Sequence, residues 1–140
     1  MKNKLKIDDD FTPWPVAEED ELYRNGIFVF NITRIMEYIQ KNPDKYQPAE
    51  VDVSEFFGEH SRINESHVES VDVSKPVILA EIAPGRYNLI DGNHRMEKAR
   101  RLGIDKVQAY RLNVNQHLQF LTGKTAYEAY VGYWNSKLEE

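Results

Sequence analysis

The sequence contains no cysteine, which excludes disulfide bonds, thiolate metal sites and a cysteine nucleophile. It has no apolar run near the roughly 18 residues that a membrane-spanning helix requires. Its first residues, MKNKLKIDDD, lack the apolar centre of a secretory signal. We therefore expect a cytoplasmic protein without a membrane partner.

The sequence has fewer basic than acidic residues, 18 against 23, and a formal net charge of -5. This balance disfavours nucleic acid as a partner, because nucleic-acid-binding domains are usually basic. Residues 95–111 nevertheless carry six Lys or Arg and only two acids. Such a local basic face attracts anionic ligands even on an acidic protein. The alternative is an ordinary solvated helix face for Lys98, Arg100 and Arg101.

The length and composition predict one domain over residues 1–140, because a chain of this size buries its own core. No repeat or low-complexity tract interrupts it. We divide it into an N-terminal extension (1–47), a core (about 48–113) and a C-terminal helical tail (114–140). The predicted fold class is α/β (α+β), a small mixed sheet with a strand–helix unit before it and helices after it.

Local patterns predict the elements of this fold. Two prolines keep residues 1–22 irregular, a strand follows at 27–30, and Asn31 caps a helix to Lys41. Further strands are expected at 51–53, 76–82, 87–90 and 107–112, with a turn at 54–58 and a helical turn or two at 64–70. The tail predicts helices at 114–121 and 125–138. The tail aromatics Tyr127, Tyr130 and Trp134 are expected to pack on the core.

The segment LIDGNHRMEKARRLG (89–103) is the least generic part of the chain. Asp-Gly between apolar runs is a hairpin signal. However, Met96, Ala99 and Leu102 recur at helical spacing after it. We therefore predict a strand, a glycine turn at Gly92 and a helix, with Gly103 just after its C-terminal end.

A strand–glycine–helix corner has the chemistry of an anion site, because the first N–H groups of a helix lack internal partners. Gly92 permits close approach of a ligand, and Asn93 is expected to cap the helix. Arg95 is predicted to grip a phosphate, His94 to add a donor or an acid, and Asp91 to accept a hydroxyl proton or hold a metal. The alternative is structural: Asp91 braces the turn and Arg95 pairs with an acid.

The run PVILAEIAPGRYNLIDGNHRMEKARRLGIDKVQAYRL (76–112) resembles the core of the ParB/sulfiredoxin superfamily. The residues that match its pattern are Gly92, His94, Arg95, Ala99, Gly103, Val107 and Ala109. The resemblance implies a nucleotide-phosphate site at Gly92, Asn93, His94 and Arg95, with ATP, ADP or CTP as ligand, with or without Mg²⁺. It further implies that the polar segment before Pro76 faces the phosphates, through Ser66, His67 and Lys75, unless that segment is an ordinary polar loop.

Three branches of the superfamily fit unequally. Asn93 stands where sulfiredoxins carry their reactive cysteine, so sulfinic acid reduction is excluded. The 28 residues after Leu112 are too few for the additional domains of partitioning ParB proteins. The free-serine kinases of this fold share the Asp-Gly-x-His-Arg corner and use a glutamate from an upstream strand. The candidates for that glutamate are Glu55, Glu65 and Glu81.

Two weaker motifs are set aside. Thr122-Gly123-Lys124-Thr125 lacks the earlier glycine of a P-loop, since that position is Leu118. His60 and His67 have no third spaced ligand, so no metal site is predicted. The sequence thus predicts a domain that binds a nucleotide or another phosphorylated small molecule, with phosphoryl transfer or phosphodiester hydrolysis as its chemistry. A non-catalytic interaction module and a DNA-binding nuclease-like domain are the alternatives, and the oligomeric state stays open.

Overall fold

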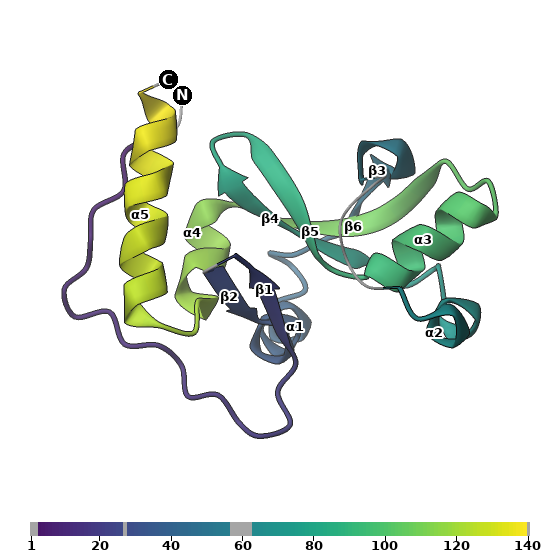
Figure 1. The fold of residues 1–140 in the computed structure, drawn as a ribbon, viewed down its shortest axis with the longest axis horizontal. Helices are drawn as coiled ribbons and strands as arrows, with labels where there is room; N and C mark the ends of the chain where they lie inside the picture. Colours follow the sequence, from purple (N-terminus) through teal and green to yellow (C-terminus); the bar gives the residue numbers. More distant parts are fainter. Residues whose placement is uncertain (1–2, 27, 57–62, 140) are drawn as a thin grey trace.

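The computed structural model describes residues 3–26, 28–56 and 63–139. It has the mixed α/β architecture predicted from the sequence (Figure 1). The elements follow in the order β1 (Leu22–Asn25), β2 (Phe28–Asn31), α1 (Ile32–Lys41), β3 (Ala49–Asp52), the 3-10 helix η1 (Val53–Phe56), α2 (Glu65–Ser70), β4 (Val77–Ala83), β5 (Arg86–Asp91), α3 (Asn93–Arg101), β6 (Lys106–Leu112), α4 (Val114–His117), the 3-10 helix η2 (Leu118–Phe120) and α5 (Lys124–Leu138).

Four strands form a mixed sheet in the order β3-β6-β4-β5. The central pair β4 and β6 is parallel, and the two outer pairings are antiparallel. Strands β1 and β2 form a separate antiparallel hairpin. β1 was not predicted, because its short sequence LYRN is only half-buried and lacks a clear apolar alternation. β1 is extended because it pairs with β2, rather than because its own sequence favours a strand.

The central strand β4 is buried along all seven residues, because both faces of the sheet are covered there. On one face, Ile78 and Ala80 pack with apolar residues of α1, α4 and α5. On the other, Val77 and Leu79 pack with α3 and η1. Figure 1 shows α3 at one end of the sheet and α4 and α5 at the other. The second face is therefore covered at the α3 end.

Most predicted elements are found, with two changes of type. The predicted strand at 51–53 ends at Asp52, and Val53 already belongs to η1. The Val53 N–H still donates to the carbonyl of Asp105, in register with the β3–β6 pairing, before the chain turns away. The predicted helix at 114–121 divides into α4 and η2. It ends early because Leu121 forms a bridge with Phe30, which requires extended backbone. The predicted turn at 54–58 falls partly outside the described residues.

The N-terminal segment runs alongside α5 (Figure 1). The Trp134 indole N–H donates to the carbonyl of Asn3 (3.0 Å), and the Asn135 side chain bonds both N–H and carbonyl of Leu5. Phe11 stacks on Tyr127 with ring centroids 4.0 Å apart. The tail aromatics Tyr127, Tyr130 and Trp134 are buried, which confirms that they pack on the core.

A buried polar cluster joins the tail to the sheet. The carbonyl of Glu81 accepts from the hydroxyl of Tyr130 (2.5 Å) and lies 2.6 Å from Nε2 of His117. The Glu81 carboxylate accepts from the N–H groups of Gly85 and Val114. Burial lowers the pKa of His117 to about 4. The neutral imidazole is therefore part of the folded core.

No helix within the described ranges has the length and apolar character to span a membrane.

Candidate functional site

Gly92 joins β5 to α3 in a left-handed conformation, with φ 104° and ψ 24°. A Cβ at this position would overlap Cγ1 of Val77 and lie 2.9 Å from Nη2 of Arg95. Glycine is therefore required both by the backbone angle and by the close packing around it. The strand–glycine–helix prediction is confirmed, and the hairpin alternative is excluded.

Asn93 does not cap α3, and this prediction was wrong. It is the first helical residue, Gly92 holds the cap position, and no side chain makes a cap bond there. A capping side chain must start from non-helical backbone, one position earlier, to reach the N–H groups of the first turn. Gly92 has no side chain to offer. The first N–H groups of α3 therefore have no side-chain acceptor. The first helical hydrogen bond runs from the N–H of Met96 to the carbonyl of Gly92 (2.9 Å).

Arg95 lies over this corner and is held by the protein itself. Its Nη2 is 3.1 Å from a carboxylate oxygen of Asp91 and 3.2 Å from the carbonyl of Pro76. This is the acid pairing that the structural alternative expected. It connects the end of β5 to the residue before β4. The Nε of Arg95 is buried without an acceptor among the described residues, and buried donors are rarely left so.

Two histidines stack beside the corner. The rings of His67 and His94 are 4.3 Å apart and nearly parallel, at 13°. The N–H of Asn64 donates to Nε2 of His94 (3.1 Å), so this nitrogen carries no proton. Burial, and next the neighbouring His67, lower the pKa of His94. His94 is thus neutral near pH 7, and its remaining N–H is a donor rather than a strong acid.

The corner opens into a cavity of about 450 Å³. The residues that line it are Glu21, Leu22, Tyr23, His67, Val71, Ile90, Asp91, Gly92, Asn93, His94 and Arg95. All five predicted corner residues and His67 are therefore brought together. Ser66 and Lys75 are not: the Ser66 hydroxyl donates to Asn64 within the cap of α2 (2.7 Å), and Lys75 is exposed in the turn before β4.

Glu21 lines the corner cavity but was not predicted from the sequence. It precedes β1, and the β1–β2 hairpin carries it to the corner cavity. Partial shielding from solvent, followed by the charge of Asp91, raises the pKa of the largely exposed Glu21, whereas Arg95 and His67 act in the opposite direction. In the sequence Glu21 ends an acidic run that looks merely solvated. Only the unpredicted strand β1 could have revealed it.

The three glutamates considered earlier lie elsewhere. Glu65 forms an ion pair with Arg101 at the α2–α3 contact. Glu81 is fully buried in the cluster with His117. Glu55 lines a different pocket, on the open part of the sheet. None of the three lines the corner cavity, whereas Glu21 does.

The other basic side chains of α3 form hydrogen bonds and ion pairs within the protein. The Lys98 ammonium donates to the carbonyls of Glu69 and Val71, both at 2.9 Å. Arg100 and Arg101 both bond Glu97, and these bonds, together with the nearby positive charges, lower the pKa of Glu97 to about 2. The interpretation as an ordinary helix face is therefore the one that the structure supports.

Comparisons with protein-family models, with curated proteins and with solved structures gave no match. Within the described ranges, no three His, Asp or Glu side chains gather as ligands of a metal ion. The site is therefore characterised by its own geometry: a glycine corner, a nine-residue helix, one arginine, two stacked histidines and two carboxylates.

Proposed function

We propose that the protein binds the phosphates of a nucleotide, as a Mg²⁺ complex, in the cavity at the Asp91–Arg95 corner. The observation that carries the proposal is the start of α3. Its cap residue Gly92 has no side chain, and the first helical residues Asn93, His94 and Arg95 all line the cavity. Free helix N–H groups, the helix dipole and an arginine together favour an anion. The ParB/sulfiredoxin resemblance of residues 76–112 supports the same ligand.

The two carboxylates at the cavity favour a metal-bound phosphate over a bare one. Glu21 and Asp91 carry two negative charges, against one positive charge on Arg95. A bare phosphate would be repelled by this excess. Mg²⁺ commonly binds through one or two carboxylates and completes its shell with phosphate oxygens and water. Asp91 can supply one such carboxylate ligand, and the two carboxylates together are too few for a metal site made of protein ligands alone.

Glu21 is the group we propose as general base if the site is catalytic. Asp91 is bonded to Arg95, so its lone pairs are partly used. No side-chain hydrogen bond holds the Glu21 carboxylate among the described residues, and its pKa is raised. A carboxylate with a raised pKa accepts a proton more readily. Positioning and charge neutralisation supply most of the remaining catalysis in phosphoryl transfer.

Thermal unfolding with ATP, ADP and CTP, each with and without Mg²⁺, tests the proposal. We expect a stabilisation of roughly 5–10 °C at about 100-fold excess over Kd, and only with Mg²⁺ present. Glu21→Gln should weaken the requirement for Mg²⁺, because it removes one of the repelling charges. Glu19→Gln, in the same acidic run but outside the cavity lining, is the matched control and should behave as wild type. No shift with any nucleotide would favour an interaction module instead.

Arg95→Ala separates the structural role of this residue from its role in binding. The loss of the Asp91 pair should destabilise the free protein by about 1–3 kcal/mol. If Arg95 also contacts phosphate, nucleotide affinity should fall by a further factor of about 10–150, corresponding to 1.5–3 kcal/mol. Isothermal titration at a temperature where the variant is fully folded measures the second effect. A destabilised variant with normal affinity would show that the corner is purely architectural.

A further inference from the structure

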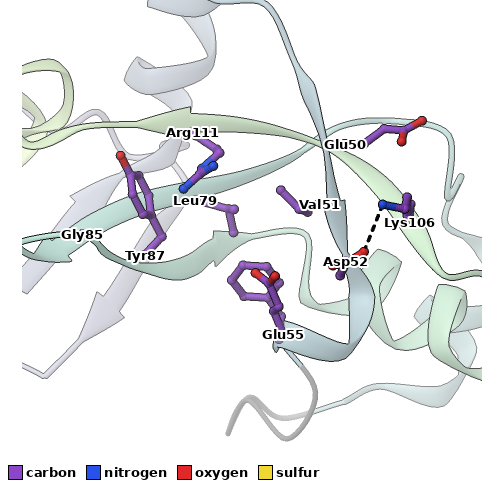
Figure 2. Close-up of a pocket in the computed structure, with 10 residues that line it drawn as sticks. Glu50, Val51, Asp52, Glu55, Leu79, Gly85, Tyr87, Lys106 and Arg111 are labelled. Carbon is purple, nitrogen blue, oxygen red and sulfur yellow. Dashed lines mark ion pairs between the residues drawn. The ribbon is translucent and has the colours of Figure 1, made fainter.

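A second pocket, which we call the sheet-face pocket, lies on the part of the sheet that α3 leaves uncovered (Figure 2). Its volume is about 270 Å³. Leu79, Val51 and Phe56 supply apolar surface, and Tyr87 and Arg111 stand at one side. The pocket shares no lining residue with the corner cavity. The two sites are therefore separate.

The charges in the sheet-face pocket are only partly neutralised. Asp52 and Lys106 pair with each other at 3.3 Å. The Arg111 guanidinium stacks on the ring of Tyr87, 4.5 Å from its centroid, and has no carboxylate partner among the described residues. Glu55 and Glu50 likewise have no basic partner there, and Figure 2 shows Glu50 on the far side of Val51 from Arg111. Stacking fixes the plane of the guanidinium and leaves its N–H edge available for a planar anion.

The charges of Arg111 and Glu55 lie on opposite sides of Leu79 in the pocket. Arg111 is opposite Leu79 in the parallel pairing of β6 with β4. Val51 is opposite Val107, four residues earlier on β6, which corresponds to about 13 Å along the strand. Glu55 is the third residue of η1 (Val53–Phe56), which directly follows β3. Figure 2 shows Leu79 between the Arg111 and Glu55 side chains, with Val51 beside them toward Asp52. An anion-binding end and a cation-binding end are thus joined by an apolar floor.

We propose that the sheet-face pocket binds a small dipolar molecule in which a carboxylate and an ammonium group are separated by an apolar chain. The carboxylate is held by Arg111, the ammonium by Glu55, and the chain lies on Leu79, Val51 and Phe56. A molecule with adjacent charges, such as an α-amino acid, satisfies only one end at a time. A simple fatty acid likewise leaves Glu55 unpaired, and a simple alkyl amine leaves Arg111 unpaired. This proposal does not depend on the function proposed for the corner.

Titration of the full chain with ε-aminocaproate and its longer ω-amino homologues, followed by NMR, tests the proposal. Norleucine is the matched ligand control, because it has the same atoms as ε-aminocaproate with the two charges adjacent. We expect at least one homologue to bind saturably with a Kd of about 1 mM or tighter, to shift resonances of Tyr87 and Leu79, and to bind at least about tenfold more tightly than norleucine, hexanoate or hexylamine.

Two variants connect binding to the named charges. Arg111→Met and Glu55→Gln should each weaken the binding of the best homologue at least about tenfold, whereas Arg86→Met should not change it. Arg86 is the matched control because it is exposed on neighbouring β5 and does not line the pocket. Both variants alter exposed side chains, and unchanged thermal unfolding verifies that they fold. The proposal is overturned if no homologue binds, if norleucine or hexanoate binds as well, or if neither variant weakens binding.

Discussion

At the scale of single residues, Gly92 determines whether the corner can form. Gly92→Ala places a methyl group against Val77 and Arg95 and forces a side chain into φ 104°. We expect a loss of about 2–5 kcal/mol in the free energy of unfolding, from backbone strain and overpacking together. Urea unfolding measures this loss.

Gly103→Ala is the matched control for Gly92→Ala. Gly103 also has a positive φ of 72°, but a Cβ there would meet nothing within 4 Å. It should therefore cost only the backbone term, about 1–2 kcal/mol. Equal losses in the two variants would show that crowding at Gly92 contributes nothing.

At the scale of elements, the helix starts divide into capped and uncapped ones. Asn113 caps α4 in a full capping box with Gln116. Asn93 makes no cap bond at α3. We expect Asn113→Ala to lower the free energy of unfolding by about 1 kcal/mol. We expect Asn93→Ala to change it by less than about 0.5 kcal/mol, since alanine favours a helix interior. Chemical unfolding of both variants checks this, and similar losses would contradict the assignment of Gly92 as the cap.

The difference between Asn93 and Asn113 shows what sequence patterns specify in this chain. Apolar spacing predicted α1, β4, α3 and β6, because burial repeats at the period of each element. The same spacing could not choose between Gly92 and Asn93 as cap, because a one-residue shift leaves the apolar face unchanged. Strand β1 was missed for a related reason: tertiary pairing, rather than local propensity, orders it. Glu21 was consequently missed as well, together with its neighbours Leu22 and Tyr23 in the cavity lining, whereas the corner residues and His67 were predicted.

At the scale of the whole molecule, His117 makes stability depend on pH. Its folded pKa of about 4 is below the ordinary value of 6.5, so the unfolded chain binds more protons between these values. The contribution of the neutral His117 to the free energy of unfolding is therefore fully present above pH 6.5. It is lost progressively as the pH is lowered towards 4. Between pH 7 and pH 5 we expect a loss of about 2 kcal/mol. Urea unfolding across this range measures it.

His117→Gln should abolish most of this pH dependence, at the cost of lower stability at pH 7. His94→Gln is the comparison, because burial and His67 also lower the pKa of His94 but its ring is only partly buried. The His94→Gln variant should keep most of the pH dependence of the free energy of unfolding. An unchanged slope in His117→Gln would assign the acid sensitivity to other groups.

The contact between the N-terminal segment and α5 has a consequence for the order in which the protein assembles. Asn3 and Leu5 bond to Trp134 and Asn135, which are synthesised about 130 residues later. On the ribosome the first residues therefore emerge long before their partners exist. The β4–β5 hairpin closes through neighbouring sequence, so it can form while the chain is still growing. Docking of the segment around Asn3 and Leu5 must therefore follow the emergence of α5.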